Sequence, residues 1–374
     1  MSMTRYQVRI TDDAGVTVAI PRDFGSCRYT LRADGEIGAA EIVLPRKKYE
    51  RIMDAANPDY RLQFWRSVNG GRTYRLDGRT EFFALQWETS DDSIRVTAPS
   101  IQHLLTRRIN AYYAGYQDIP SGAGAIYSGP ASTIMRQVVD ANFITGVGLA
   151  ARDVFGPVIG FASGILSIGG LAGVGPLLNV AVTRENVFDI ISKVADAAFT
   201  QGRWMAGLMT SNGGSWTFAP YLDYAGIDRR QTLILSPDAR NIQNAVLNEN
   251  SINEKSSIIA AGRGTGSARY ISNVQSAAII ARSLYGYKEM FVENTNARNA
   301  QIVNLARSAL RKNRMTTELT CDLTQLYGTI RGIHYDVGDY LRVQYLGKRF
   351  DMRLDMVEVS LTGGSSVESA RLST

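Results

Sequence analysis

The side chains most often used in catalysis are few in this chain and lie far apart in the sequence. The chain contains two histidines, His103 and His334, and two cysteines, Cys27 and Cys321. None of them belongs to a His-Glu-x-x-His sequence, a closely spaced cysteine pair or a Gly-x-Ser-x-Gly nucleophile elbow. Zinc hydrolysis and catalysis by a Cys/His or Ser/His pair are therefore poorly supported, and we predict no catalytic residue, no cofactor and no metal ion.

Two weaker patterns could also carry chemistry. Asp223, Asp228, Glu289 and Glu293 are candidate cleft acids for catalysis by carboxylates alone, although isolated surface carboxylates are common. The glycine-rich stretch 262–266 could be taken for a phosphate loop, but it lacks the third glycine of the dinucleotide fingerprint and the Gly-Lys-Ser/Thr of a Walker loop. We interpret this stretch as a turn that needs flexible backbone between two strands.

Length, composition and charge describe an ordered multidomain protein. With 374 residues the chain is too long for one compact domain. Its formal charge of +6 is spread over scattered arginines, which does not predict sequence-specific binding to nucleic acid. Two distant cysteines make no disulfide framework, and the N-terminus runs into an alternating strand without an apolar signal segment. We expect synthesis in a reducing compartment.

The two ends of the chain share one pattern of strands and turns. Alternating apolar and polar residues separated by Gly, Asn and Asp turns predict antiparallel strands, in a barrel or a sandwich. The order of these elements is the same near both ends, although few residues are identical. The corresponding segments are 40–44, 59–65, 81–87 and 93–97 near the N-terminus and 317–323, 338–345, 352–359 and 369–373 near the C-terminus.

Helices are expected between the two repeats. Apolar residues at helical spacing predict one helix over 129–139, with apolar positions 134, 135, 138 and 139. A second predicted helix begins with Thr183 as its N-cap and has apolar positions 187, 190, 191, 194 and 198. A further helix, with Asn296 as its cap, has apolar positions 302, 305, 306, 309 and 310. Strands are predicted at 204–209 and 215–221. The fold class predicted is thus a β-rich, multidomain α+β protein.

The segment 144–182 is the most unusual part of the sequence. No residue from Val154 to Val182 is ionisable, and seven of them are glycines. Three interpretations stay open: a loop packed against other copies in an oligomer, a segment delivered into a target membrane, and ordinary core. We name as its candidate interaction residues Phe155, Ile159, Phe161, Ile165, Leu166, Ile168 and Leu171.

Four stretches, in order along most of the chain, resemble the baseplate hub or tail-tip hub family of long-tailed bacteriophages. They are residues 96–109, 257–264 with 268–270, 283–292 and 336–343. The resemblance implies two tail-tube-like antiparallel β-barrel modules with an α+β domain between them and a small helical insert. We accordingly predict a first barrel at 1–110, an α+β domain at 111–235, a second barrel at 236–270 and 315–374, and the insert at 271–314.

The resemblance also implies a function. Such hubs are homotrimers in which two modules per chain present six similar edges to a sixfold tail tube, and they close the tube until DNA ejection. The implied partners are a distal tail or tail-tube protein ring, the tape measure protein, and tip or fibre proteins, on a virion assembled in the host cytoplasm. Because the sequence stops after its last strand, we expect no lytic domain. Two alternatives remain: a peptidoglycan-degrading tail enzyme, and the hub of a phage-derived particle such as a gene transfer agent or contractile injection device.

Overall fold

The structure is a computed structural model of the chain. It describes residues 4–12, 14–54, 60–68, 70–110, 125–144, 165–182, 185–266, 269–282, 284–294, 299–326, 328–362 and 365–374.

The N-terminal part, here called the first module, consists almost entirely of short strands. Alternation of buried and exposed residues is regular in the longer ones, because side chains of a strand point to opposite faces of its sheet. Its elements are β1 (Arg5–Thr11), β2 (Thr17–Ala19), β3 (Ser26–Arg32), β4 (Ala39–Pro45), α1 (Arg46–Asp54), β5 (Arg61–Ser67), β6 (Arg75–Leu76), the 3₁₀ turn η1 (Asp77–Arg79), β7 (Phe82–Phe83), β8 (Gln86–Thr89), β9 (Ser93–Pro99) and the 3₁₀ helix η2 (Ile101–Arg107).

The central domain packs two helices against small sheets and has its own apolar core. Core residues of η2 also belong to this cluster, so the central domain is fastened directly to the end of the first module. Its elements are β10 (Ala125–Pro130), α2 (Ala131–Val139), the π-helical turn η3 (Asp140–Ile144), β11 (Leu166–Ile168), β12 (Leu177–Val182), α4 (Val187–Thr200), β13 (Met205–Ser211) and β14 (Trp216–Leu222).

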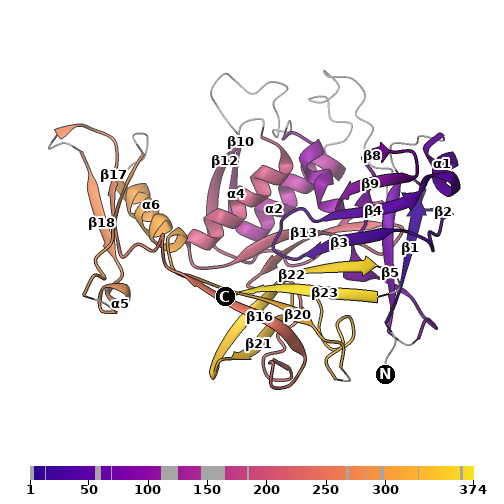
Figure 1. The fold of residues 1–374 in the computed structure, drawn as a ribbon. Helices are drawn as coiled ribbons and strands as arrows, with labels where there is room; N and C mark the ends of the chain where they lie inside the picture. The colour runs from indigo at the N-terminus through magenta and orange to yellow at the C-terminus, as the bar shows by residue number, and fades with distance from the viewer. Residues whose placement is uncertain are drawn as a thin grey trace, which may run out of the picture.

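The second module follows and is interrupted by an insert. The second module contains β15 (Ile234–Leu235), β16 (Ile242–Asn250), β20 (Thr316–Leu323), β21 (Tyr340–Tyr345), β22 (Lys348–Thr362) and β23 (Ser365–Ser373). The insert contains β17 (Ser257–Ala261), β18 (Ile271–Gln275), α5 (Ala277–Ile280), β19 (Glu289–Glu293) and α6 (Asn299–Lys312). β17 pairs with β18 and β19 and packs on α6, which places residues 257–261 in the insert and not in the second module. Figure 1 shows the insert projecting sideways from the rest of the molecule.

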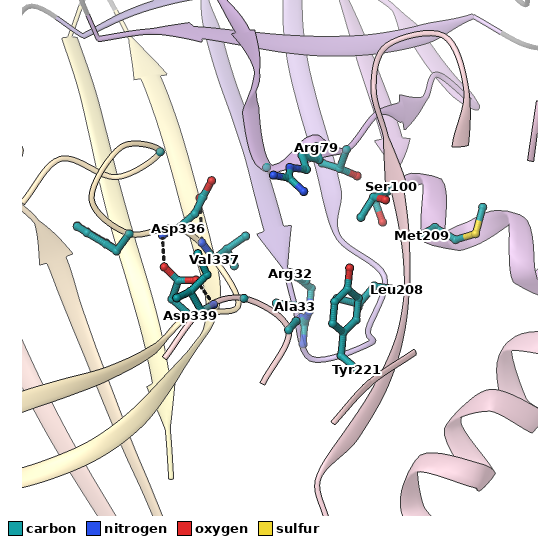
Figure 2. Close-up of a pocket in the computed structure, with 18 of the residues that line it drawn as sticks. Arg32, Ala33, Arg79, Ser100, Leu208, Met209, Tyr221, Asp336, Val337 and Asp339 are labelled. Atoms are coloured by element: carbon teal, nitrogen blue, oxygen red, sulfur yellow. Dashed lines mark hydrogen bonds between the residues drawn. The ribbon is translucent and has the colours of Figure 1, made fainter. Parts of the chain in front are cut away.

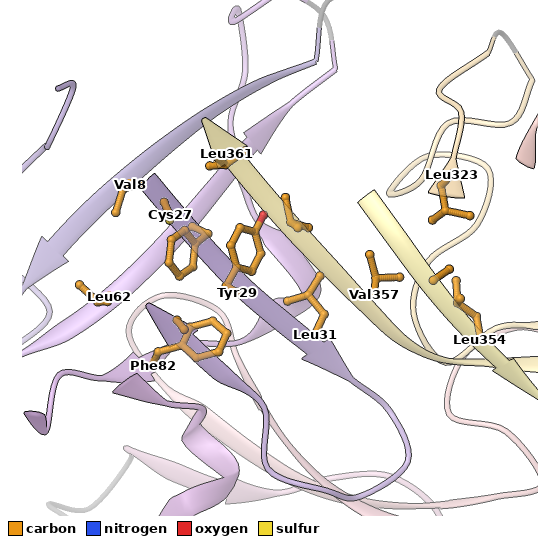
Figure 3. Close-up of a cluster of buried hydrophobic side chains, with 14 of the residues drawn as sticks. Val8, Cys27, Tyr29, Leu31, Leu62, Phe82, Leu323, Leu354, Val357 and Leu361 are labelled. Carbon is orange, nitrogen blue, oxygen red and sulfur yellow. The ribbon is translucent and has the colours of Figure 1, made fainter. Parts of the chain in front are cut away.

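Strands from both ends of the chain form a single sheet. Its main path is β16-β20-β23-β22-β3-β4-β9-β8, with β15 and β21 attached beside β22. Beneath it lies one apolar core to which both modules contribute, from Val8 and Tyr29 to Leu323 and Leu354 (Figure 3). None of the sheets formed by the described strands closes into a barrel. The β-rich α+β class is therefore confirmed, with the two repeats fused instead of separate.

The helix predictions were right about the buried faces and partly wrong about the ends. All the apolar positions predicted on α2 and α4 are buried, and those on α6 are buried or partly buried. The N-cap prediction of Thr183 was wrong. α4 begins at Val187, and Asn186 caps it by accepting a hydrogen bond of 2.8 Å from the backbone N–H of Asp189. The second predicted cap, Asn296, lies outside the described residues.

Candidate functional site: the module junction and the free sheet edges

The two modules are joined by strand pairing between β22 and β3. The pairing is antiparallel and runs from Met356 opposite Arg32 to Leu361 opposite Cys27. Six residues of each strand are paired, so the joint is a regular part of the sheet. Backbone hydrogen bonds across the joint therefore tie together two parts of the chain that are more than 300 residues apart.

The order of strands is the same in the two halves of this sheet. The first module contributes β3-β4-β9-β8, and the second contributes β16-β20-β23-β22. The segments that correspond in sequence take corresponding places: β4 matches β20, β9 matches β23, and β8 matches β22. The repeat seen in the sequence is thus a repeat of sheet topology, and the joint connects the last strand of one half to the first strand of the other.

A buried group of charged residues lies beside the joint. Arg331, which is fully buried, donates to both carboxylate oxygens of Asp77 at 2.9 and 2.8 Å. Its Nε donates to Glu368 at 2.6 Å. Arg66 reaches the same Glu368 at 3.2 Å and donates to the backbone carbonyl of Arg331. The hydroxyl of Tyr29 donates to Asp77 at 2.6 Å, so all the charges in this junction cluster have partners.

The charges of this junction cluster depend on one another. Burial by itself raises the pKa of Asp77, but the Arg331 guanidinium outweighs burial and holds that pKa below its ordinary value. The pKa of Glu368 is likewise raised by burial and lowered further by Arg331 and Arg66, with a net decrease. Asp77 and Arg66 come from the first module, and Arg331 and Glu368 come from the second. The ion pairs therefore link the modules through side chains as well as through backbone.

Two buried polar residues fix the central domain to the first module. Glu81, which is fully buried, accepts hydrogen bonds from Gln63 and Ser211 at 2.8 Å each and from the indole of Trp216 at 3.2 Å. Gln102 donates to the carbonyl of Gly207 at 2.8 Å and accepts from the backbone N–H of Met209 at 2.8 Å. Gln102 belongs to the first of the four family-like stretches, so that stretch anchors β13.

A cleft of about 430 Å³ lies where the two modules and the central domain meet. Figure 2 shows Asp336, Val337 and Asp339 on one side of it and Leu208 and Met209 of β13 on the other. The fourth family-like stretch supplies the first side.

Asp339 shapes the wall of this cleft. Its carboxylate accepts from the backbone N–H of Ile227 at 2.7 Å and from Arg229 at 2.8 Å. A Cβ on Gly226 would lie 2.1 Å from an Asp339 oxygen, so only glycine fits there. Both carboxylate oxygens are occupied by these bonds, which gives Asp339 a structural role in the connection to the second module.

The ends of the large sheet are β8 and β16, and neither has a second neighbour among the described strands. Among the described strands, residues 246–250 of β16 pair regularly with β20 on one side only, and residues 86–88 of β8 pair with β9 on one side only. Val246 on β16 is 60% exposed. An unpaired strand edge offers a row of backbone donors and acceptors to another strand, so these two edges are the candidate assembly surfaces.

The predicted interaction residues are only partly within the described chain. Phe155, Ile159 and Phe161 lie outside it. Leu166 and Ile168 belong to β11, which pairs in parallel with β14, and both pack with Ile165 on the core of the central domain. Leu171 is exposed on the following turn. The prediction of an interaction surface therefore stays a prediction, centred on the part of the segment before Ile165.

The titratable candidates do not gather in one place. Asp223 pairs with Arg203 at 2.8 Å, Asp228 pairs with Arg230 at 2.7 Å, and Glu293 pairs with Arg269. Burial raises the pKa of both cysteine thiols to about 12. The described residues hold no group of three or more metal-ligating side chains, and no helix within them is long and apolar enough to span a membrane.

The glycine-rich stretch 262–266 joins β17 to β18. Its Gly264 has φ +111° and Gly266 has φ +57°, conformations that favour glycine. The interpretation of this stretch as a flexible turn is confirmed.

Comparison with known proteins finds one family that matches nearly the whole chain. The sequence profile of the family described as Siphovirus ReqiPepy6 Gp37-like protein matches residues 7–367. A search of the curated proteins found no match.

Solved structures share the fold at low sequence identity. The 43 kDa tail protein of prophage MuSo2 from Shewanella oneidensis gives a TM-score of 0.58 at 10% identity, over 98% of this chain and 98% of that chain. A tail protein from Neisseria meningitidis MC58 gives 0.56 at 11% identity, over 99% and 96%. A Francisella PdpA–VgrG complex in its half-lidded form gives 0.51 at 8% identity, over 99% of this chain and 58% of that chain.

Proposed function

The chain belongs to the Siphovirus ReqiPepy6 Gp37-like protein family, and from this premise we propose that it is a structural tail protein that forms a homotrimeric hub at the tail tip of a bacteriophage. The resemblance to phage tail hubs drawn from four sequence stretches agrees with the family match and with the fold shared with two tail proteins. The remaining questions are how copies of the chain associate and what the assembly does.

The observation that carries the proposal is the joint between β22 and β3. It connects the last strand of one four-stranded half to the first strand of the other. The two strands at the ends of the sheet are again the last strand of one half, β8, and the first strand of the other half, β16. A second copy can therefore add its β16 to β8 by repeating the type of contact that already exists inside each chain. Repetition of one heterologous contact builds a ring when the rotation closes.

Three copies would bring six similar halves into such a ring. The contact inside the chain and the contact between chains would alternate, so a threefold assembly would present a nearly sixfold surface. That geometry supports the adaptor role implied by the family: the hub docks on a distal tail or tail-tube protein ring and closes the tube. The tape measure protein and the tip or fibre proteins are its other proposed neighbours.

We propose a structural and not an enzymatic role on the virion. The candidate carboxylates Asp223 and Asp228, on the connection between β14 and β15, and Glu293, on β19, are each held in an ion pair. A peptidoglycan zymogram tests this point, since a clearing band that disappears when one carboxylate is replaced would establish a lytic enzyme.

The mass of the purified protein tests the hub itself. Three copies of the 41.0 kDa chain weigh about 123 kDa, and we expect this species in sedimentation velocity at micromolar concentration. A protein that stays monomeric alone and in the presence of its neighbouring tail proteins would refute the proposed trimer.

A second candidate is the hub of a phage-derived particle. The fold shared with the Francisella PdpA–VgrG complex supports this second candidate, because that structure is not named as a phage tail protein. The neighbouring genes distinguish the two: a complete set of capsid, packaging and lysis genes around tape measure and tube genes indicates a phage.

A further inference from the structure

A second cleft, of about 450 Å³, lies where the insert, the central domain and the second module meet. It is unrelated to the cleft of Figure 2 and to the free sheet edges. α4 contributes Phe199, the segment before β13 contributes Trp204, and the end of α6 contributes Arg311. Arg314 follows α6, and Arg353 comes from β22. Five parts of the chain thus converge on one small space.

Three arginines in this cleft lie over aromatic rings. The Cζ atom of Arg314 lies 5.0 Å from the ring centroid of Phe199, and that of Arg353 lies 4.7 Å from the ring centroid of Trp204. The Cζ atom of Arg230 lies 4.4 Å from the ring centroid of Tyr340. Cation–π contacts of this kind restrain a guanidinium, whose N–H groups can bind a carboxylate or phosphate through two parallel bonds.

The positive charge of the cleft is only partly balanced. Arg230 is paired with Asp228 and Asp351, and Lys312 at the rim is paired with Asp196 at 2.8 Å. Arg353 lies 3.4 Å from Asp355 and donates to the Oγ of Ser373 at 3.0 Å and to the terminal residue Thr374 at 3.4 Å, so it is occupied as well. Arg311 instead donates to the backbone carbonyl of Thr200, at the end of α4. Among the described residues no carboxylate lies within ion-pair distance of Arg311 or Arg314.

Arg314 is the most accessible of these groups. Its side chain is exposed, and its described contact is the cation–π contact with Phe199. Partial burial, followed by the neighbouring guanidiniums of Arg353 and Arg311, lowers the pKa of Arg314, which agrees with an excess of positive charge. An anion placed at the edge of Arg314 would relieve this repulsion.

We propose that this cleft binds a peptide segment of a partner protein through a single carboxylate flanked by apolar side chains. The guanidinium N–H groups would bind the carboxylate. The rings of Phe199 and Trp204, with the neighbouring Met315, would pack against the apolar side chains on either side of it. Asp223 lines the cleft, and Asp196 and Glu318 line the neighbouring hollow that shares Arg311 and Arg314 with it; these carboxylates would repel a run of phosphates, which disfavours nucleic acid. The site does not depend on trimerisation, because one chain supplies all of it.

Titration of the full-length protein with two matched peptides tests the proposal. The probe is acetyl-Leu-Asp-Leu-amide, and the isosteric acetyl-Leu-Asn-Leu-amide lacks only the charge. We expect calorimetry to show saturable binding of the aspartyl peptide and at least about tenfold weaker binding of the asparaginyl peptide. Arg314→Gln should weaken binding of the aspartyl peptide by a similar factor. Arg314→Lys should weaken this binding less, because lysine keeps the positive charge and loses only the planar guanidinium and its contact with Phe199.

Arg263→Gln is the matched control, since Arg263 is equally exposed but lies on the β17–β18 turn. Its affinity should equal that of the parent, and the thermal unfolding midpoints of all three variants should be unchanged. The proposal is overturned if the aspartyl peptide shows no saturable binding at millimolar concentration, or if Arg314→Gln binds it like the parent. It is also overturned if a single-stranded oligonucleotide binds more tightly than the peptide and depends on Arg314.

Discussion

Arg331 and Asp77 form a bidentate ion pair across 254 residues of sequence, with N–O distances of 2.9 and 2.8 Å. Asp77 belongs to the first module and Arg331 to the second. Both side chains are almost completely buried beside the strand joint. Breaking such a pair leaves a charge inside the protein without compensation, so we expect this contact to contribute strongly to holding the two modules together.

Replacing the arginine should separate the modules more readily than any surface change. Arg331→Met leaves the buried carboxylates of Asp77 and Glu368 with only Arg66 as a cationic partner. We expect the free energy of unfolding to fall by about 3–5 kcal/mol, measured by urea denaturation of the purified protein. Arg28→Met is the control: Arg28 pairs with Glu358 at 4.0 Å across the same joint, but its side chain is 61% exposed. That change should cost about 1 kcal/mol or less.

Acid should weaken the same joint. The folded protein holds the pKa values of Asp77 and Glu368 below their ordinary values of about 3.9 and 4.3. Their contribution to the free energy of unfolding is therefore complete when the pH is above these ordinary pKa values. It is lost as the pH falls through the lower pKa values of the folded state. We expect the urea midpoint to drop steeply below about pH 4. The triple variant Arg331→Met, Asp77→Asn, Glu368→Gln should show a shallower drop, and equal slopes would contradict this assignment.

A charge on the free edge should prevent assembly without unfolding the chain. Val246→Lys places an ammonium group on β16, a device by which edge strands avoid pairing. We expect mass photometry to show loss of the trimer, with an unchanged circular dichroism spectrum. Thr320→Lys is the matched control, because Thr320 is also exposed but lies on β20, where it pairs with Val246 of β16 on one side and with Arg371 of β23 on the other. Trimers of Val246→Lys as stable as those of the parent would exclude β16 as the contact.

Glu81 should be required for the attachment of the central domain. Glu81→Ala removes the acceptor for Gln63, Ser211 and Trp216 in a fully buried place. We expect a loss of about 2–4 kcal/mol in unfolding free energy and a red shift of tryptophan emission, since buried donors without partners are costly. Glu289→Ala, on the exposed face of β19, should change neither quantity. An unchanged emission maximum in Glu81→Ala would show that Trp216 is held by packing alone.

The apolar segment can be tested without removing the strand that the structure places in the core. Replacing residues 151–164 by a Gly/Ser linker of equal length spares β11 and removes Phe155, Ile159 and Phe161. If the segment packs between copies, the trimer should dissociate at higher concentration than the parent, as measured by sedimentation. Leakage of liposomes caused by the parent and lost in the replacement, with trimers unaffected, would favour contact with a membrane.

Much of the local structure could be predicted from the sequence. The strand segments of both repeats, the buried faces of α2, α4 and α6, and the turn at 262–266 follow from residue spacing, because burial of one face imposes a period of two or 3.6. The cap of α4 was misplaced because Thr183 and Asn186 are both good caps, and the choice depends on distant residues: backbone bonds to residues 108–110 keep residues 185–187 extended, and Val187 packs in the core. The insert was predicted to begin after residue 270, because nothing in the sequence of β17 indicates that it pairs with β18 and β19 instead of with strands of the second module.

The sequence by itself determined that a β pattern occurs twice and that helices and an apolar segment lie between the copies. Only the tertiary structure decided that the copies share one sheet through β22 and β3, and that Arg331, Asp77, Arg66 and Glu368 meet beside it. The physical reason is the range of the interactions. Periodicity and turns act between neighbours in the chain, whereas strand pairing and ion pairs join residues whose separation in sequence carries no signal of their contact.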